Sequence, residues 1–386
     1  MIANYYLLQR FFKIIIAHKS ILLFAIILFG LSLISCDPFV DTIDEVRNCE
    51  NYSKSKPISE ISKDTISIMT WNIRFGCGTE ILWFGDACGG RTILKRDEVE
   101  KNLDLLVSAI NTIRPDILLL QEVDINSKRT AYIDEMHYIM NRTYFNYGYY
   151  GTNWNIQFIP SDGIGRINTG NSILSVWPIS DVKSHPLPLR NDLDALTKYF
   201  YVREIVMSCK IKMPNETEIN VINTHLSAFS TDNTKKRQLE EYLIICDELS
   251  SMGIPLITGG DYNLLPPNSD SLDYCDEDKC SDEHFHSHGD DPLHKEGSNY
   301  APEIDWLNLI YDGYFPSLPL DIYKANQPMY FSHATFPNIP YDRTLDYLFA
   351  NRKWIEGSHQ THQEYRKYSD HAPVSALINT RASEGE

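Results

Sequence analysis

Short apolar segments along the chain end repeatedly in Asn, Glu, His or Asp. Residues 116–122 contain an unbroken apolar run, which is typical of a strand buried on both faces. Residues 66–72 and 218–225 are also predicted strands, and they end in Asn72 and His225. The pattern predicts several buried strands whose polar ends converge on one site.

The segment 256–263 shows this arrangement most clearly. Its apolar run ends in Gly259 and Gly260, and Asp261 and Asn263 follow two positions apart. In an extended chain, residues i and i+2 point to the same side. We therefore expect Asp261 and Asn263 to project together from the end of a buried strand, where the glycines permit close approach of backbone or ligand.

Two long segments have helical periodicity instead. Residues 95–113 carry apolar side chains at helical spacing up to Pro115, and residues 234–251 repeat the pattern. Residues 170–175 and 201–207 are predicted strands of a second sheet. Residues 344–349 are a further predicted strand, and residues 369–374 open the last one. Many strands with only two long helices predict an α/β fold of two packed sheets with helices outside.

The N-terminus has the features of an export signal. Three basic residues precede its apolar run: Arg10, Lys13 and Lys19. The run, residues 21–34, is shorter than the roughly 20 residues that a membrane span needs. Residues 33–36, Leu-Ile-Ser-Cys, resemble a bacterial lipoprotein cleavage box in which Cys36 becomes the lipidated N-terminus. An uncleaved signal anchor is the alternative.

These features divide the chain into three parts. Residues 1–35 are the predicted lipoprotein signal peptide, residues 36–64 a polar membrane tether without apolar periodicity, and residues 65–380 the folded domain. We expect an extracytoplasmic lipoprotein, anchored to a membrane in the periplasm or at the cell surface of a bacterium. We also expect a monomer.

Charge and cysteine content restrict the class of protein. The formal net charge is −17, and the chain after the signal segment holds 52 acidic against 32 basic residues. This argues against nucleic-acid binding through a broad basic face, but not against an acidic enzyme that meets phosphate through a divalent cation. In an oxidising compartment Cys77 with Cys88, and Cys275 with Cys280, could close short loops.

The polar residues at the strand ends form a chemically coherent set: Asn72, Glu122, His225, Asp261, Asn263, Asp346, Asp370 and His371. Carboxylates with an amide oxygen and no cysteine suit a hard cation such as Mg²⁺ or Mn²⁺. Histidines beside carboxylates suit acid–base work and the binding of a charged oxygen. Hydrolysis of a phosphate ester needs that combination. Each residue alone could simply cap a strand or a turn, so the prediction depends on their co-occurrence.

The same segments resemble the endonuclease/exonuclease/phosphatase superfamily, which includes DNase I-like nucleases, abasic-site endonucleases, neutral sphingomyelinases and inositol polyphosphate phosphatases. They span residues 65 to about 377 in the family's order. The matching stretches are Thr70-Trp71-Asn72-Ile73-Arg74, Leu119-Leu120-Gln121-Glu122-Val123-Asp124, Gly170-Asn171-Ser172-Ile173-Leu174-Ser175, Asn223-Thr224-His225-Leu226, Gly259-Gly260-Asp261-Tyr262-Asn263, Leu345-Asp346-Tyr347 and Ser369-Asp370-His371.

The resemblance implies a four-layer α/β sandwich and a metal-dependent phosphoesterase. Glu122 would be the main metal ligand, with Asn72 and Asp370 nearby, and the metal would be Mg²⁺ or Mn²⁺. Asp261 would position or deprotonate the attacking water, and Asn263 would contact the phosphate.

The resemblance assigns the remaining site residues as well. His371, oriented by Asp346, would face the scissile phosphate, with His225 as the second phosphate-facing histidine. Asn171 would contact the substrate.

The substrate stays open between nucleic acid, a phospholipid headgroup and a sugar phosphate, because specificity in such folds lies in loops. Aromatic residues between 144 and 154 could stack on a substrate or simply pack as a rim. The histidines of residues 283–291 could bind a transition metal or belong to a solvated insertion. A non-catalytic binding lipoprotein, or a protein-docking role for residues 264–300, are the competing functions.

Overall fold

The computed structural model describes residues 39–55, 63–83, 89–159, 163–278, 298–335 and 339–379. The chain divides into two units, Met1–Phe39 and Val40–Glu386, and every element described below belongs to the second. The predicted signal peptide with Cys36, as well as Cys88, Cys280 and the histidine-rich residues 283–291, lie outside the described residues. None of the described helices has the length and apolar character needed to cross a membrane.

One seven-stranded sheet has the order β13-β14-β3-β4-β6-β5-β2. Its central strands β3 and β4 are parallel, and β6 pairs antiparallel to β4. The strands are β2 (Glu50–Asn51), β3 (Thr65–Asn72), β4 (Ile117–Asp124), β5 (Tyr147–Ile159), β6 (Gly163–Ser175), β13 (Gln360–Thr361) and β14 (Val374–Asn379).

The other seven-stranded sheet has the order β1-β7-β8-β9-β10-β12-β11. Its central strands β9 and β10 are parallel, and β12 pairs antiparallel to β10. The strands are β1 (Arg47–Asn48), β7 (Ile179–Pro186), β8 (Ile205–Lys212), β9 (Glu218–His225), β10 (Leu256–Asp261), β11 (Phe315–Pro316) and β12 (Asp346–Ala350).

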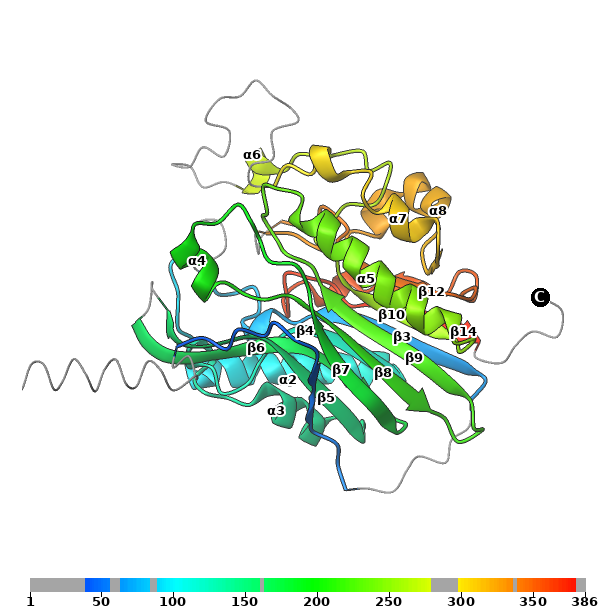
Figure 1. Ribbon diagram of the computed structural model, residues 1–386, viewed down its shortest axis with the longest axis horizontal. Helices are drawn as coiled ribbons and strands as arrows, with labels where there is room; N and C mark the ends of the chain where they lie inside the picture. The colour runs from blue at the N-terminus through cyan, green and yellow to red at the C-terminus, as the bar shows by residue number, and fades with distance from the viewer. Residues whose placement is uncertain are drawn as a thin grey trace, which may run out of the picture. The chain divides into compact units, whose positions relative to one another are not determined.

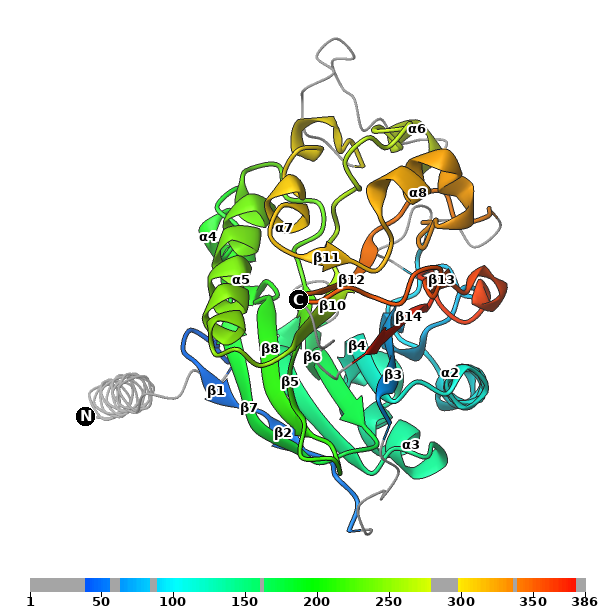
Figure 2. The same ribbon diagram turned by 90° about the vertical axis from the view of Figure 1, so that its right-hand side faces the viewer.

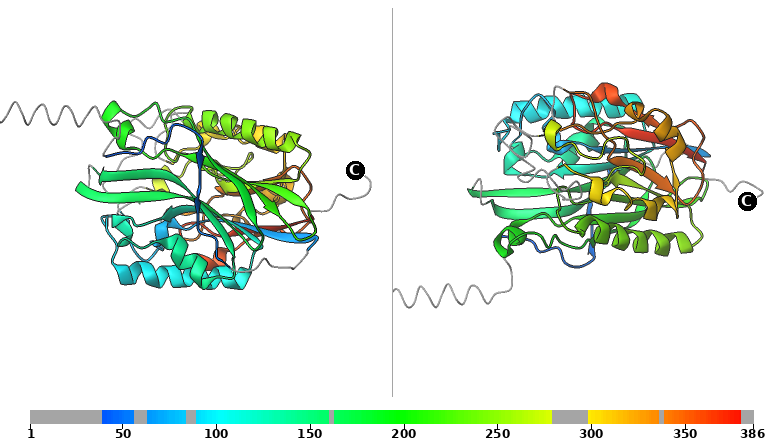
Figure 3. Two further views of the ribbon diagram at one scale, coloured as in Figure 1. Left: turned by 60° about the horizontal axis from the view of Figure 1, so that its bottom comes forward. Right: turned by 90° about the horizontal axis from the view of Figure 1, so that it is seen from above.

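Helices cover the outer face of each sheet, so the domain has four layers (Figures 1 and 3). Helices α2 (Arg96–Ile113) and α3 (Glu135–Arg142) pack on the first sheet, and α5 (Thr234–Ser251) packs on the second. A separate apolar cluster fills the space between the sheets. Shorter helices are α4 (Ala195–Phe200), α6 (Cys275–Asp278), α7 (Asn308–Tyr311) and α8 (Leu320–Ala325), and α7 and α8 lie close to β11 and β12 (Figure 2).

The predicted α/β sandwich of two packed mixed sheets flanked by helices is confirmed, with β9 and α5 at the predicted bounds. The sheet assignment of residues 170–175 was wrong. They end strand β6, which pairs with β4 in the first sheet, whereas 201–207 leads into β8 in the second. Each segment holds a short run of buried apolar residues, Ile173-Leu174 in one and Ile205-Val206-Met207 in the other, and such a run does not distinguish one sheet of a sandwich from the other.

The N-terminal segment also differs from the expected tether. Strands β1 and β2 pair with β7 and β5, and the side chains of Val40 and Ile43 are buried. Residues 40–55 therefore run along the edges of both sheets as part of the folded domain. Two-residue strands carry no detectable periodicity, so only their pairing with the sheet edges reveals them.

A buried amide joins the two sheets near their polar ends. Asn223 of β9 donates through Nδ2 to the carbonyl oxygens of Leu120 (2.8 Å) and Ser172 (2.9 Å) in the other sheet. Its Oδ1 accepts from Gln121 Nε2 at 2.7 Å. The β4–β6 ladder shifts register directly after Leu120, at a bulge. The amide of Asn223 thus satisfies backbone carbonyls beside that irregularity.

We predict that Asn223→Ala lowers the free energy of unfolding by about 3 kcal/mol, because it leaves buried carbonyls without a donor. Urea unfolding monitored by tryptophan fluorescence measures the change. Asn220→Ala is the matched control, since Asn220 lies on the same strand but its side-chain amide donates to Leu249 O, at 3.2 Å, and to no group of the other sheet among the described residues. Equal losses in the two variants would contradict the cross-sheet role.

Candidate functional site

The polar strand ends meet around one cavity of about 310 Å³. Register explains part of the convergence, because Asp261 of β10 pairs with His225 of β9 on one side and Asp346 of β12 on the other. The predicted site residues that line the cavity are Glu122, His225, Asp261, Asn263, Asp370 and His371. Asn72 and Asp346 lie behind them and hydrogen-bond to them.

Left-handed backbone conformations direct several of these side chains. Glu122 has a φ of 55° within the β4 bulge, Asn263 has a φ of 50° just after β10, and Arg74 has a φ of 49° just after β3. Such angles are uncommon for residues with a side chain. Bulges and strand ends next to active sites use them to re-aim a side chain.

Asp261 is the centre of the site. Its buried carboxylate accepts from Asn72 Nδ2 at 3.1 Å and from the backbone N–H of Asn263 at 2.9 Å. His225 Nε2 and His371 Nε2 each lie 3.5 Å from Asp261 Oδ2. Asn72 belongs to the first sheet and Asp261 to the second, so this carboxylate spans the two sheets.

Asp346 orients His371 from behind. Its Oδ2 lies 2.9 Å from His371 Nδ1 and also accepts from Ser332 Oγ at 2.6 Å. Burial alone would lower the pKa of His371, but the carboxylates of Asp346 and Asp261 outweigh it and raise the pKa to about 10. His371 is therefore an imidazolium at neutral pH, able to donate toward the cavity.

His225 has a carboxylate neighbour of its own. Burial raises the pKa of Glu204 to about 7, and Glu122 and Asp261 add to the shift. Burial lowers the pKa of His225, but Asp261 and Glu204 more than reverse this. Glu204 precedes β8, lines the cavity and accepts from Asn153 Nδ2 at 3.2 Å.

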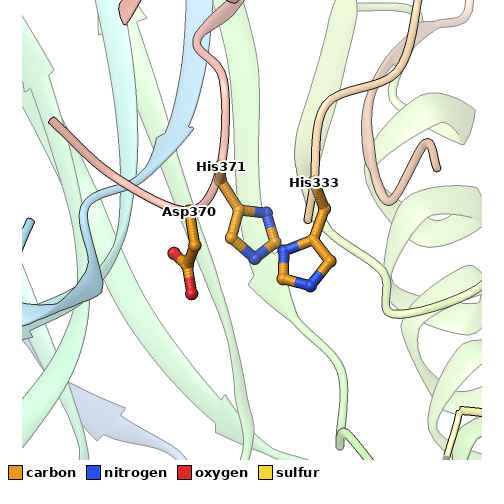
Figure 4. A group of neighbouring side chains, drawn as sticks. All are labelled: His333, Asp370 and His371. Atoms are coloured by element: carbon orange, nitrogen blue, oxygen red, sulfur yellow. The ribbon is translucent and has the colours of Figure 1, made fainter. Parts of the chain in front are cut away.

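The cavity residues that the sequence analysis did not predict include Arg74, Glu204 and His333. The His333 ring lies 4.3 Å from that of His371, with Asp370 on the other side of His371 (Figure 4). Burial and the charge of His371 hold the pKa of His333 well below its usual range, so His333 is neutral. A histidine outside any strand end carries no periodic signal, although Arg74 lies inside a segment already singled out.

Asn171 does not reach the cavity. Its side chain is fully buried, and neither polar atom has a hydrogen-bond partner among the described residues. The structure therefore brings together every predicted site residue of the described chain except Asn171. Asn153 and Thr169, from β5 and β6, line the cavity instead.

Comparison with known protein families identifies the family of this chain. The profile of the endonuclease/exonuclease/phosphatase family matches residues 69–371. The chain belongs to this family. No curated protein matches the chain in sequence.

Two solved structures share the fold of this chain. The chain is similar to the endonuclease/exonuclease/phosphatase from Beutenbergia cavernae DSM 12333, with 18% identity, a TM-score of 0.54, and coverage of 82% of this chain and 72% of that one. It is also similar to a functionally unknown conserved protein from Enterococcus faecalis V583, with 14% identity, a TM-score of 0.50, and coverage of 81% and 100%.

Enzymes of the endonuclease/exonuclease/phosphatase family hydrolyse phosphoesters and typically use divalent metals, and the cavity residues fit a hard cation. Glu122 and Asp370 offer carboxylate oxygens in the cavity. His333, Asp370 and His371 also lie close enough to share an ion, as do Asp261, Asp346 and His371, but Mg²⁺ and Mn²⁺ prefer oxygen ligands to imidazole nitrogen. The oxygen donors are the better fit.

Two predicted ligands have other partners as well. The amide of Asn72 donates to Glu122 Oε1 at 3.0 Å, and its Oδ1 accepts from the backbone N–H of Arg74 at 3.0 Å. Asn72 therefore positions Glu122 with its nitrogen. Asp370 forms an ion pair with Arg74 Nε at 3.2 Å.

A lysine from a buried ion pair hydrogen-bonds to the backbone of Asn263. Lys235 of α5 donates from Nζ to the carbonyl oxygen of Asn263 at 2.7 Å and pairs with Glu303, and both charged side chains are almost fully buried. Asn263 also donates from Nδ2 to Leu226 O at 2.9 Å. These contacts fix the left-handed residue next to Asp261.

We predict that Lys235→Met destabilises the domain by roughly 3–5 kcal/mol, because it leaves the Glu303 carboxylate buried without its partner. The double variant Lys235→Met/Glu303→Leu removes both charges, so we expect a much smaller loss. Urea unfolding measures both. The control is Lys236→Met, whose exposed pair with Glu240 at 3.9 Å contributes at most about 1 kcal/mol. A double variant as unstable as Lys235→Met would contradict this account.

We predict that Asp346→Asn moves the pKa of His371 down from about 10 toward its ordinary value of about 6.5. Because the folded-state pKa is the raised one, the stability contributed by the protonated ring is complete below about pH 6.5 and is lost as pH rises through about 10. Imidazole NMR shifts followed from pH 5 to pH 11 measure the titration. A His371 ring that titrates near neutrality in the unsubstituted protein would refute the assignment.

Proposed function

We propose that this chain is a divalent-metal-dependent phosphoester hydrolase, a phosphodiesterase or phosphatase, attached to the outside of a bacterial membrane by lipid on Cys36. The observation that carries the proposal is the contact of Asp261 with both His225 and His371, at 3.5 Å each, at the wall of one cavity. A carboxylate between two histidines places a proton acceptor for the attacking water beside hydrogen-bond donors for the phosphoryl oxygens. Attack of water on a phosphorus centre requires both.

The metal in this proposal is Mg²⁺ or Mn²⁺, held by Glu122 and Asp370, with Asn72 setting the position of Glu122. Its carboxylate ligands suit a hard cation. Once bound, the ion would neutralise charge on the phosphoryl oxygens.

Each side chain then has a defined task. Asp261 orients the attacking water and accepts its proton, and Asn72 and the Asn263 N–H hold that carboxylate in place. His371, kept protonated by Asp346, donates to a non-bridging oxygen as negative charge develops there. His225, from the neighbouring strand, donates to a second oxygen. Asn263 lines the same wall of the cavity.

We predict that Asp261→Asn and His371→Ala each lower kcat at least about 100-fold while the near-UV circular dichroism stays unchanged. The protein for this assay is residues 37–386, which contain both sheets and all described helices. The substrates are plasmid DNA, vesicles of sphingomyelin or phosphatidylinositol, and soluble phosphomonoesters, each with Mg²⁺ and with EDTA. Asp312→Asn, an exposed carboxylate after α7, is the matched control.

Turnover of at least one substrate, lost with EDTA and in both site variants but not in Asp312→Asn, is the expected result. Full activity in Asp261→Asn would refute the mechanism. A folded protein that hydrolyses none of the three substrates would contradict the hydrolase proposal and favour a binding protein that keeps the fold.

A further inference from the structure

The packed N-terminal segment leaves little free chain between the proposed anchor and the domain. Val40 is buried and forms a bridge with Ile156 of β5, and Asp41 N donates to Asn155 O at 2.9 Å. Cys36 lies only four residues before Val40. A fully extended chain of that length reaches at most about 14 Å. Whatever path those residues take, lipid on Cys36 would hold Val40 close to the membrane.

Val40 enters the domain beside the β5–β6 hairpin and α4. Its side chain forms a small apolar cluster with Ile156 and Ile167, on which Trp154, Tyr199 and Phe200 pack. The Trp154 indole donates to Phe200 O at 2.7 Å, which ties the hairpin to α4. The position of Val40 therefore identifies the part of the domain nearest the anchor.

This part of the domain carries large apolar side chains exposed to solvent. Ile164 at the hairpin end is 88% exposed, Leu196 of α4 is 68% exposed, and Phe229 in the loop after β9 is 56% exposed. We call these three residues the apolar rim. Single exposed apolar residues are ordinary, but 88% for an isoleucine leaves nearly all of its surface in water.

Arg190 connects Phe229 to the α4 segment. Its guanidinium donates to Phe229 O at 3.0 Å and to the Tyr201 hydroxyl at 2.9 Å, and it pairs with Asp192 at 2.6 Å. Phe229 itself has a left-handed φ of 53°. An aromatic residue held in such a conformation by a buried arginine is a built feature of the surface.

The charges beside the rim also suit a membrane. Lys128, Arg166 and Lys198 lie on η2 (Lys128–Thr130), β6 and α4, in a chain whose net charge is −17. Long basic side chains keep their charge in the headgroup layer while their stems cover apolar surface. The acidic residues of the α4 segment have partners, because Asp192 pairs with Arg190 and Asp194 caps α4 through the N–H of Leu196.

One residue of the rim also belongs to the cavity. Phe229 lines the cavity together with Trp154, from the hairpin that Val40 joins, and Tyr201, directly after α4. The elements that carry the exposed apolar residues thus also contribute to one wall of the site.

We propose that the apolar rim docks on the lipid surface that carries the anchor, and that the substrate is the phosphoester of a lipid headgroup in that surface. This inference rests on the proposed hydrolase activity and on the proposed lipid at Cys36. The occupant of the rim is the membrane itself, since the chain leaves the domain at Val40, beside the β5–β6 hairpin and α4, and lipid on Cys36 would lie within about 14 Å of Val40.

The test uses residues 37–386, without lipid, so that only the domain can bind vesicles of phosphatidylethanolamine and phosphatidylglycerol. The rim variant is Ile164→Ser/Leu196→Ser. The matched control is Ile244→Ser/Met252→Ser, which changes apolar residues at α5 and its C-terminal end that are 52% and 56% exposed. We predict that the rim variant binds vesicles at least ~10-fold more weakly than the control, because it loses the burial of two large side chains in lipid. Vesicle co-sedimentation measures the binding.

Hydrolysis separates this inference from the proposed function. The rim variant is expected to lose activity on phospholipid in vesicles by a similar factor while keeping its rate on a soluble phosphodiester. Equal binding by the rim and control variants, or no binding by the unsubstituted domain, would overturn docking even if the enzyme is active. Rim-dependent binding without hydrolysis of any substrate would instead refute the hydrolase and leave the docking surface standing.

Discussion

The buried carboxylate of Asp261 is the constraint on which the site depends. It takes one hydrogen bond from Asn72 in the opposite sheet and lies between His225 and His371. A buried carboxylate is costly unless it is hydrogen-bonded or paired, so the two sheets must keep their relative position for Asp261 to keep the hydrogen bond from Asn72. The geometry of the site therefore depends on the same alignment of the two sheets that stabilises the sandwich.

Asn223 meets that requirement with polar contacts in an apolar interior. Its amide bonds to Leu120 O and Ser172 O, next to the bulge that turns Glu122 toward the cavity. Apolar packing alone tolerates small slippage between sheets, whereas a fully bonded amide accepts only one alignment. At the bulge, the strand ladder leaves carbonyl oxygens that need a hydrogen-bond donor from the other sheet, and Asn223 supplies it. Asn223 therefore both aligns the sheets and stabilises the irregular backbone beside the site.

The sequence predicted the fold class and most of the site because both follow from strands. Asp261, His225 and Asp346 stand at strand ends, where apolar periodicity stops and register brings neighbours together. His333 and Glu204 were missed because they precede or lie between strands and gain their roles only from tertiary contacts. The short edge strands of residues 40–55 were missed because pairing with a finished sheet, not local pattern, orders them.

That misjudged segment changes how an acidic domain would sit at a membrane. The sequence predicted a flexible tether of nearly 30 residues, 36–64. Such a tether would let the domain of a chain with net charge −17 stay away from an anionic surface. With Val40 packed, the proposed lipid on Cys36 would hold Val40 within about 14 Å of the membrane surface. Charges are largely screened beyond about 8 Å at physiological ionic strength, so the repulsion acts only on the surface closest to the lipid. That surface carries Lys128, Arg166 and Lys198 as well as Asp44 and Glu45, which are exposed a few residues after Val40, so the basic residues offset the acidic surplus there only in part.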